Sequence, residues 1–190
     1  MRYYPVFLDL VGRRCIVVGG GKVAERKVRT LIKAGACVLV ISPDLTKGLI
    51  KLKREKRISY RKDFYQKKLI KKAFLVIAAT DNKKINSRIS YDCNSLRIPV
   101  NVVDSPELSS FICPAVLSKG DLTFAISSSG FAPSLSKKIK IDLRRSIIPK
   151  YSKFLSKIKY FRKDLKLNCP DNKLRRRLLR YFVNSNISKI

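Results

Sequence analysis

A glycine-rich turn between a short apolar run and a helical segment constrains this chain more than any other feature. The apolar run is CIVV at residues 15–18, the turn is Gly19-Gly20-Gly21, and residues 22–34 have the composition of a helix. That segment is followed by Gly35, a residue that commonly ends helices. A strand, a glycine turn and a helix in this order are typical of a βαβ unit that binds a dinucleotide.

The turn matches the pattern G-x-G-x-x-A, in which each small residue has its own role. Gly19 allows the tight turn, Gly21 lets the backbone approach a pyrophosphate, and Ala24 lets the helix pack close to the sheet. The pyrophosphate is then expected at the N-terminus of the helix. The alternative is a glycine turn that serves only for packing.

Strand-like and helix-like segments alternate through the first 112 residues. Short apolar runs predict further strands at residues 37–41, 58–60, 73–79 and 99–103, and helices are expected between them at residues 46–56 and 83–96. Alternation of this kind predicts an α/β fold with a Rossmann-like parallel sheet.

The pattern changes beyond that point. Residues 111–117 and 122–127 are strand-like runs joined by Ser118-Lys119-Gly120-Asp121, which predicts a hairpin, and a helix is expected over residues 134–145. Apolar residues at helical spacing continue after Pro149, a break is expected at residues 168–171, and a last helix is expected from 173 to about 182. We therefore expect a nucleotide-binding domain over 1–112, a hairpin-plus-helix module over 113–146 and a helical C-terminal domain over 147–190.

The charge of the chain is extreme, with 43 Lys and Arg residues against 13 Asp and Glu residues and a formal net charge of +30. One explanation is an acidic partner, and the other is compositional drift in an AT-rich genome, because the lysines are spread over the whole chain. We expect no nucleic-acid partner, since no recognisable motif interleaves aromatic and basic residues. We expect no membrane partner, since no apolar run approaches the length of a membrane span.

The chain contains no histidine, which removes imidazole as a general base and as a metal ligand. Its five cysteines are far apart and form no CxxC motif, so no protein metal site is expected. The odd number of cysteines and the absence of a signal sequence indicate a reducing, cytoplasmic location.

Aspartates stand where ligands of open α/β sheets bind, beyond the carboxyl ends of the strands. Asp104 and Asp81 each follow a predicted strand, and a carboxylate is the natural general base in a chain without histidine. A helix cap or a turn is the alternative role for such an aspartate. Asp44 stands close to the place of a ribose-binding acid, and Lys47 nearby leaves the choice between NAD and NADP open.

Four segments together resemble the bifunctional precorrin-2 dehydrogenase/sirohydrochlorin ferrochelatase family, which also forms the N-terminal part of siroheme synthases. They are YPVFLDLVGRRCIVVGGGKVAERK, AFLVIAATDN, PVNVVDSPELSSFICPA and FAISSSGFAPSLSKKI. The resemblance covers nearly the whole chain. It implies NAD-dependent oxidation of precorrin-2 to sirohydrochlorin, followed by insertion of Fe²⁺, a substrate, to give siroheme.

The resemblance also implies roles for particular residues. Asp104 matches the aspartate that the family uses in both steps, and Ser128 matches a serine that lies near the tetrapyrrole site and is modified in some members. Ser129 and Gly130 beside it are further candidates for substrate binding. Contacts with NAD are implied around the turn and the next strand end, and the candidate residues are Gly19, Gly21, Lys22, Val23, Pro43, Asp44 and Thr80.

The family is a homodimer joined through the segment after the nucleotide domain, so the module at 113–146 is expected to be the dimerisation module. The substrate carries eight carboxylates and supplies four nitrogen ligands to the iron, so a basic chain without histidine suits both reactions. A non-catalytic NAD-binding sensor is the alternative, because it needs Gly19, Gly21 and Ala24 but not Asp104. The sequence leaves open whether the chelatase activity is retained and whether Co²⁺ is also inserted.

Overall fold

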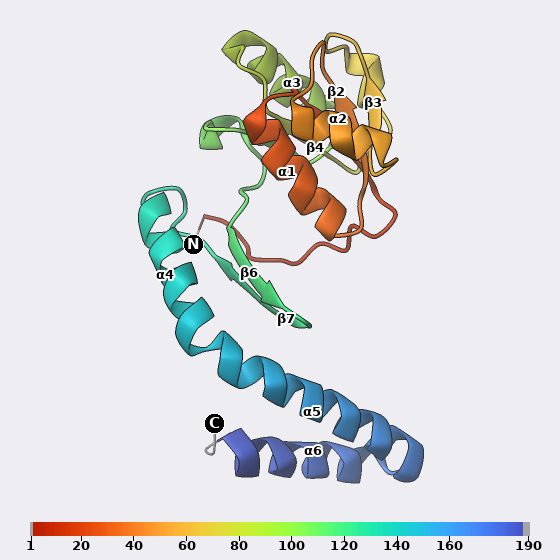
Figure 1. The fold of residues 1–190 in the computed structure, drawn as a ribbon, viewed down its shortest axis with the longest axis vertical. Coiled ribbons are helices and arrows are strands. Elements are labelled where there is room, and N and C mark those ends of the chain that lie inside the picture. Colours follow the sequence, from red (N-terminus) through yellow and green to blue (C-terminus); the bar gives the residue numbers. More distant parts are fainter. Residues whose placement is uncertain (1, 188–190) are drawn as a thin grey trace. The chain divides into compact units, whose positions relative to one another are not determined.

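The computed structural model describes residues 2–187 and divides into two compact units, Met1–Cys113 and Pro114–Ile190 (Figure 1). The further division of the second unit near residue 146 stays a prediction. No helix among residues 2–187 is long and apolar enough to cross a membrane.

The first unit is built on a five-stranded parallel sheet. Its elements follow the chain as β1 (Arg14–Val18), α1 (Lys22–Lys33), β2 (Cys37–Ile41), α2 (Lys47–Arg54), β3 (Ser59–Arg61), the 3₁₀ turn η1 (Lys67–Leu69), β4 (Leu75–Ala78), α3 (Lys83–Ser95), β5 (Val100–Val102) and the 3₁₀ turn η2 (Pro106–Leu108). The strand order is β3-β2-β1-β4-β5, and every neighbouring pair is parallel. The predicted α/β class with a Rossmann-like parallel sheet is confirmed.

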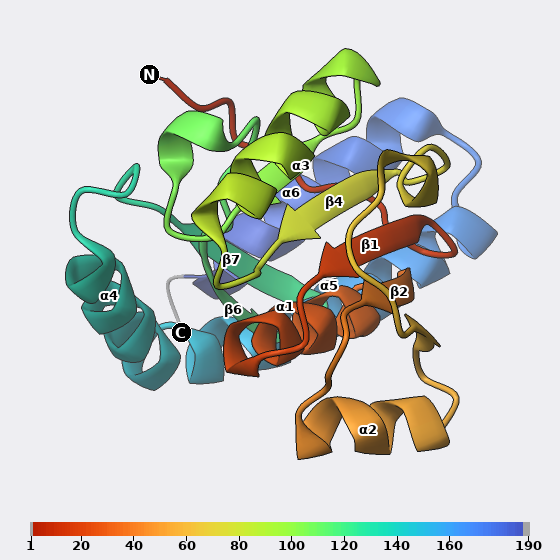
Figure 2. The same cartoon turned by 90° about the horizontal axis from the view of Figure 1, so that it is seen from above.

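Alternating side chains of the strands bury two apolar layers, one on each face of the sheet. Val17 of β1 packs with Val28 of α1 and Leu49 of α2 on one face. Ile16 of β1 packs with Ile89 of α3 on the other face. Figure 2 shows α3 on one side of β4 and β1, with α1 and α2 on the other side. Because both faces are covered, the central strands are continuous apolar runs, as expected for a parallel sheet.

Asp92, a buried residue of α3, holds the segment between β3 and β4 against that helix. Its carboxylate accepts a hydrogen bond of 2.9 Å from the Tyr65 hydroxyl and forms an ion pair of 3.5 Å with Lys67 Nζ. The resulting contacts lie on the connection that leads into β4, so they stabilise the fold away from the carboxyl ends of the strands.

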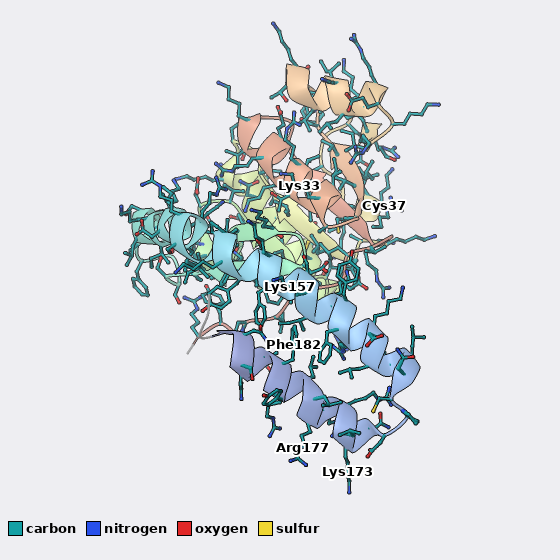
Figure 3. The ribbon with its side chains drawn as sticks, turned by 60° about the horizontal axis from the view of Figure 1, so that its bottom comes forward. Lys33, Cys37, Lys157, Lys173, Arg177 and Phe182 are labelled. Carbon is teal, nitrogen blue, oxygen red and sulfur yellow. The ribbon has the colours of Figure 1, made fainter. Side chains whose placement is uncertain are left out.

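The second unit contains a hairpin and three helices. The hairpin pairs β6 (Ala115–Lys119) antiparallel with β7 (Leu122–Ile126), and the helices are α4 (Pro133–Ser146), α5 (Ile148–Asn168) and α6 (Asn172–Ile187). Figure 3 shows α5 and α6 side by side, and Phe182 of α6 stacks on Phe154 and Phe161 of α5 with ring centroids 6.2 and 4.4 Å apart. The predicted break at residues 168–171 separates α5 from α6.

The sequence placed the start of the hairpin at residue 111, and this boundary is wrong because β6 begins at Ala115. The Phe111 carbonyl instead accepts a hydrogen bond of 3.0 Å from Asn101 Nδ2 in β5. The segment before β6 therefore packs on the edge of the parallel sheet in the first unit.

Candidate functional site

Two of the three glycines in the turn after β1 are required by packing within the protein. Gly19 has a φ of +122°, and a β-carbon there would overlap with the carbonyl of Ala79 at the end of β4. A β-carbon on Gly20 would overlap with the carbonyl of Asp44, which follows β2. The turn thus lies directly against the ends of both strands that flank β1, and only glycine permits this approach.

Gly21 differs from its neighbours because it faces open space. A β-carbon on Gly21 would meet no atom within 4 Å, and its φ of −80° is accessible to any residue. Gly21 is the N-cap of α1 and offers no side-chain hydrogen bond, whereas Thr46 caps α2 and Asn82 caps α3. The N–H groups of the first turn of α1 therefore have no capping side chain. This arrangement fits a bound pyrophosphate.

The loop after β2 is tied to the glycine turn and to α1. Thr46 donates its backbone N–H to the Gly20 carbonyl at 3.0 Å and its hydroxyl to Glu25 Oε2 at 2.6 Å. The hydrogen bond from Thr46 and the neighbouring Arg29 hold the pKa of Glu25 below its usual value. Pro43 and Asp44 lie in this loop, and Asp44 is exposed, so the loop places the predicted ribose-binding acid beside the turn.

The turn after β4 is locked by Asn86, a buried residue of α3 that sequence reasoning missed. Asn86 Oδ1 lies 2.7 Å from the Thr80 hydroxyl, and Asn86 Nδ2 donates to the Thr80 carbonyl at 2.9 Å. The turn also contains Asn82, whose side chain caps α3. The Thr80 hydroxyl is thus engaged within the protein, and its neighbour Asp81 is exposed.

Asp104 follows β5 in a left-handed conformation, with a φ of +58°. Ser109 and Ser110 fold back so that their hydroxyl oxygens accept hydrogen bonds from the N–H groups of Val102 and Val100, at 2.8 and 2.7 Å. These serines satisfy the open edge of β5 in place of a further strand. A left-handed backbone conformation such as that of Asp104 is unusual outside glycine and often occurs at functional sites.

The acidic residues at this end of the sheet differ from the other acidic residues of the chain. Four of the 13 acidic residues make no hydrogen bond or ion pair through their side chains with any other residue in the described range, and they are Asp44, Asp81, Asp104 and Glu107. All four lie just beyond the carboxyl ends of β2, β4 and β5. In a chain with a formal charge of +30, carboxylates without a protein partner are notable, and they are available to a ligand.

The serine-rich loop between β7 and α4 belongs to the second unit. The Ser128 hydroxyl oxygen accepts a hydrogen bond of 3.1 Å from the Ala132 N–H and lies 3.2 Å from the hydroxyl of Ser136, a buried residue. Ser128 therefore helps to start α4. Ser129 and Gly130 have φ values of +55° and +91° and are exposed.

The structure thus brings together the predicted cofactor residues Gly19, Gly21, Lys22, Val23, Pro43, Asp44 and Thr80 at one end of the parallel sheet, where Asp104 also lies. The predicted substrate residues at 128–130 are in the other unit. Among residues 2–187, no group of three or more cysteine or acidic side chains is placed to hold a metal ion, and all five cysteines are free. Burial raises the pKa of the Cys15 thiol to about 11 and that of Cys93 to about 12, which makes both unreactive.

A parallel sheet in the order β3-β2-β1-β4-β5, with a glycine turn and an uncapped helix after its central strand, defines a dinucleotide-binding domain. A family model described as putative NAD(P)-binding matches residues 6–115, which is more than half of the chain. The chain belongs to this NAD(P)-binding family.

The chain is also similar to curated siroheme synthases. It is 40% identical over 181 residues to that of Nitrosospira multiformis and 36% identical over 189 residues to that of Saccharophagus degradans. These matches cover 93% and 100% of this chain but only 38% and 41% of the relatives, so the chain spans about two fifths of their length. The predicted resemblance to siroheme synthases is confirmed.

Among solved structures, the precorrin-2 dehydrogenase SirC matches with a TM-score of 0.81 and 24% identity. The match covers 97% of this chain and 91% of that chain. It shows that the fold of both units is shared over almost their whole length.

Proposed function

We propose that this chain catalyses the NAD-dependent dehydrogenation of precorrin-2 to sirohydrochlorin in siroheme biosynthesis. The observation that carries the proposal is the similarity to siroheme synthases over 93–100% of the chain. The carboxylates without partners among residues 2–187 support it, because they lie at the same end of the sheet as the glycine turn and a dehydrogenase needs a base close to its cofactor. The shared fold with a solved precorrin-2 dehydrogenase is consistent with the same reaction.

The cofactor in this proposal is NAD, which serves as the acceptor of a hydride equivalent from the macrocycle. Gly19, Gly21, Lys22 and Val23 would hold its pyrophosphate through the turn and the uncapped first turn of α1. Asp44 would accept hydrogen bonds from the adenosine ribose, with Pro43 and Thr80 lining the same end of the sheet. A carboxylate at Asp44 repels a 2′-phosphate, which favours NAD over NADP.

Asp104 is the general base in this proposal. Dehydrogenation removes two hydrogens from the macrocycle, one with its electron pair and one as a proton, and the proton goes to the Asp104 carboxylate. Asp104 suits this role because it is exposed at the end of β5 and its carboxylate has no hydrogen-bond or ion-pair partner among residues 2–187. The loop held by Ser109 and Ser110 fixes its backbone.

We propose insertion of Fe²⁺ into sirohydrochlorin as a second activity of the same site. Two pyrrole N–H protons must leave as the metal enters, and Asp104 is the base proposed for them as well. The four nitrogens of the macrocycle supply the iron ligands, so a cluster of protein ligands is not required.

The substrate carboxylates are proposed to bind Ser128, Ser129 and Gly130, in the loop that precedes α4. We further propose that two copies associate through the second unit, since Val116, Leu135, Ile139 and Ile141 are exposed apolar residues there.

Five free cysteines are consistent with a reducing cytoplasmic location.

The proposal is tested by following tetrapyrrole absorbance while enzyme, NAD and Fe²⁺ are added in turn. We expect conversion of precorrin-2 to sirohydrochlorin only after NAD is added, and a second spectral change only after Fe²⁺ is added. If the first spectral change occurs without the second, the proposed dehydrogenase activity is retained and the proposed chelatase activity is rejected. Binding of NAD with no turnover of precorrin-2 contradicts the proposal and favours a non-catalytic sensor.

A further inference from the structure

We propose that Tyr60 of β3 is a positioning residue for cofactor binding, and that it acts by holding the loop at residues 42–46, here called the ribose loop. Tyr60 does not belong to the glycine motif and lies on a different strand from the residues proposed to contact the cofactor. It is half-buried beneath the ribose loop. The proposal concerns cofactor affinity and rests on the part of the proposed function that places NAD at this end of the sheet.

The Tyr60 hydroxyl lies between two consecutive carbonyl groups of the ribose loop. Its oxygen is 3.0 Å from the Ser42 carbonyl oxygen and 3.1 Å from the Pro43 carbonyl oxygen. A hydroxyl carries one proton, so this donor is shared between both carbonyls. Asp44 is the next residue in the chain. Because the two peptide units before it are held by the Tyr60 hydroxyl, the hydroxyl also helps to fix the position of Asp44.

The opposite end of the ribose loop is fixed by contacts with the glycine turn and α1. The Thr46 N–H donates to Gly20, the Thr46 hydroxyl donates to Glu25, and the Asp44 carbonyl lies against Gly20. These contacts hold the end of the loop, whereas Tyr60 alone among the described side chains bonds to its first two residues. Without the hydroxyl, the beginning of the loop loses its side-chain support.

The surroundings of Tyr60 favour the protonated hydroxyl, which is the form that donates a hydrogen bond. Burial, and secondly the negative charge of Asp44, raise the pKa of Tyr60 above its usual value. Lys53 Nζ lies 4.9 Å from the centre of the ring and holds the side chain by a cation–π contact.

The test compares Tyr60→Phe with a matched control, Tyr65→Phe. Both substitutions remove one tyrosine hydroxyl from the same unit, but Tyr65, on the connection before β4, donates to Asp92 of α3. We expect the dissociation constant for NAD, measured by titration without a tetrapyrrole, to rise about 3- to 10-fold in Tyr60→Phe. We expect the dissociation constant to stay unchanged in Tyr65→Phe, and we expect that variant to unfold at a lower temperature because it loses the hydrogen bond to Asp92.

A second measurement separates positioning from a general loss of stability. In steady-state assays, Tyr60→Phe is expected to raise KM for NAD by the same factor while KM for the tetrapyrrole is unchanged. Unchanged NAD affinity in Tyr60→Phe overturns the proposal, and so does an equal loss of affinity in both variants. If NAD binds as expected but precorrin-2 is not turned over, the proposed function fails while the role of Tyr60 stands.

Discussion

The backbone of Gly20 lies against the main-chain carbonyl of Asp44, so closely that a β-carbon on Gly20 would overlap with it. The next residue, Gly21, faces open space at the start of α1. Two adjacent glycines therefore serve different purposes. Gly20 is required for the protein to pack on itself, and Gly21 leaves room for a ligand to approach the backbone.

This difference predicts opposite phenotypes for substitutions at the two positions. Gly21→Val adds a branched side chain where the pyrophosphate needs the backbone, so we expect a folded protein whose affinity for NAD falls at least 10-fold. Gly20→Ala is expected to lower the melting temperature, because the loop after β2 must move. Calorimetry and NAD titration on both variants measure the melting temperature and the NAD affinity. Unchanged NAD binding in a folded Gly21→Val variant would show that the turn is not part of the cofactor site.

Asp104→Asn keeps the size of the side chain but cannot accept the proton. Loss of a general base typically lowers a rate by roughly 10²–10⁴-fold, so we expect a decrease of this size in dehydrogenation and in iron insertion, with NAD binding retained. Both rates are measured by tetrapyrrole absorbance.

Asp81→Asn is the matched control, because Asp81 is also exposed, follows a neighbouring strand and has no partner among residues 2–187. It is expected to retain both activities. If Asp81→Asn abolishes dehydrogenation while Asp104→Asn does not, the base is assigned to the wrong residue. If only dehydrogenation falls in Asp104→Asn, the two reactions use different bases.

We expect a homodimer in solution. Among the described residues, the sheet of β6 and β7 has two strands, so neither edge is paired with a further strand, and such edges are usually covered by another chain or element. Sedimentation analysis at micromolar concentration measures the mass directly. A monomeric mass throughout the concentration range contradicts the prediction.

The positive charge of the chain is expected to assist capture of the tetrapyrrole. Salt screens this electrostatic attraction, and the screening affects the ligand with more charge most strongly. Rising salt should therefore raise KM for the octacarboxylate substrate more than KM for NAD. Steady-state kinetics between low and physiological ionic strength measure both. Equal effects on the two constants indicate that the net charge of +30 reflects composition alone.

Glu25 is expected to contribute a pH-dependent part of stability. Its pKa is lowered in the folded protein, first by the hydrogen bond from Thr46 and then by Arg29. A carboxyl whose pKa is lowered by folding stabilises the folded protein at pH values above its pKa in the unfolded chain, which is near 4. This stabilisation is lost as the pH falls through the lower pKa that the carboxyl has in the folded protein. Glu25→Gln is therefore expected to reduce the free energy of unfolding by about 1 kcal/mol at pH 7.

The difference between wild type and Glu25→Gln should shrink as the pH falls below about 4, because a protonated carboxyl resembles the amide. Denaturant titrations at several pH values measure it. Glu55→Gln serves as a control, since the exposed ion pair of Glu55 with Lys51 is expected to contribute little. A difference for Glu25→Gln that does not change with pH argues against the ionised carboxylate as its cause.

Most helices and strands of the first unit could be predicted from the sequence. The parallel strands are short apolar runs because both faces of the sheet are covered, and Gly35 follows the first helix as expected. The boundary at residue 111 was wrong because Phe111 is apolar and strand-like, while the hydrogen bond from Asn101 that decides its place joins residues ten positions apart. Local pattern carries no information on such a bond.

The sequence by itself determined the fold class, the glycine turn and the positions of Asp44, Asp81 and Asp104 after strands. Hydrophobic periodicity, the conformational freedom of glycine and the order of residues are local properties, so they can be identified from the sequence alone. Only the tertiary structure decided which glycine faces open space, which acidic residues have no partner among residues 2–187, and that the Tyr60 hydroxyl bonds to the ribose loop. These depend on contacts such as that between Gly20 and Asp44, or between Thr46 and Glu25, which form only when separate elements pack together.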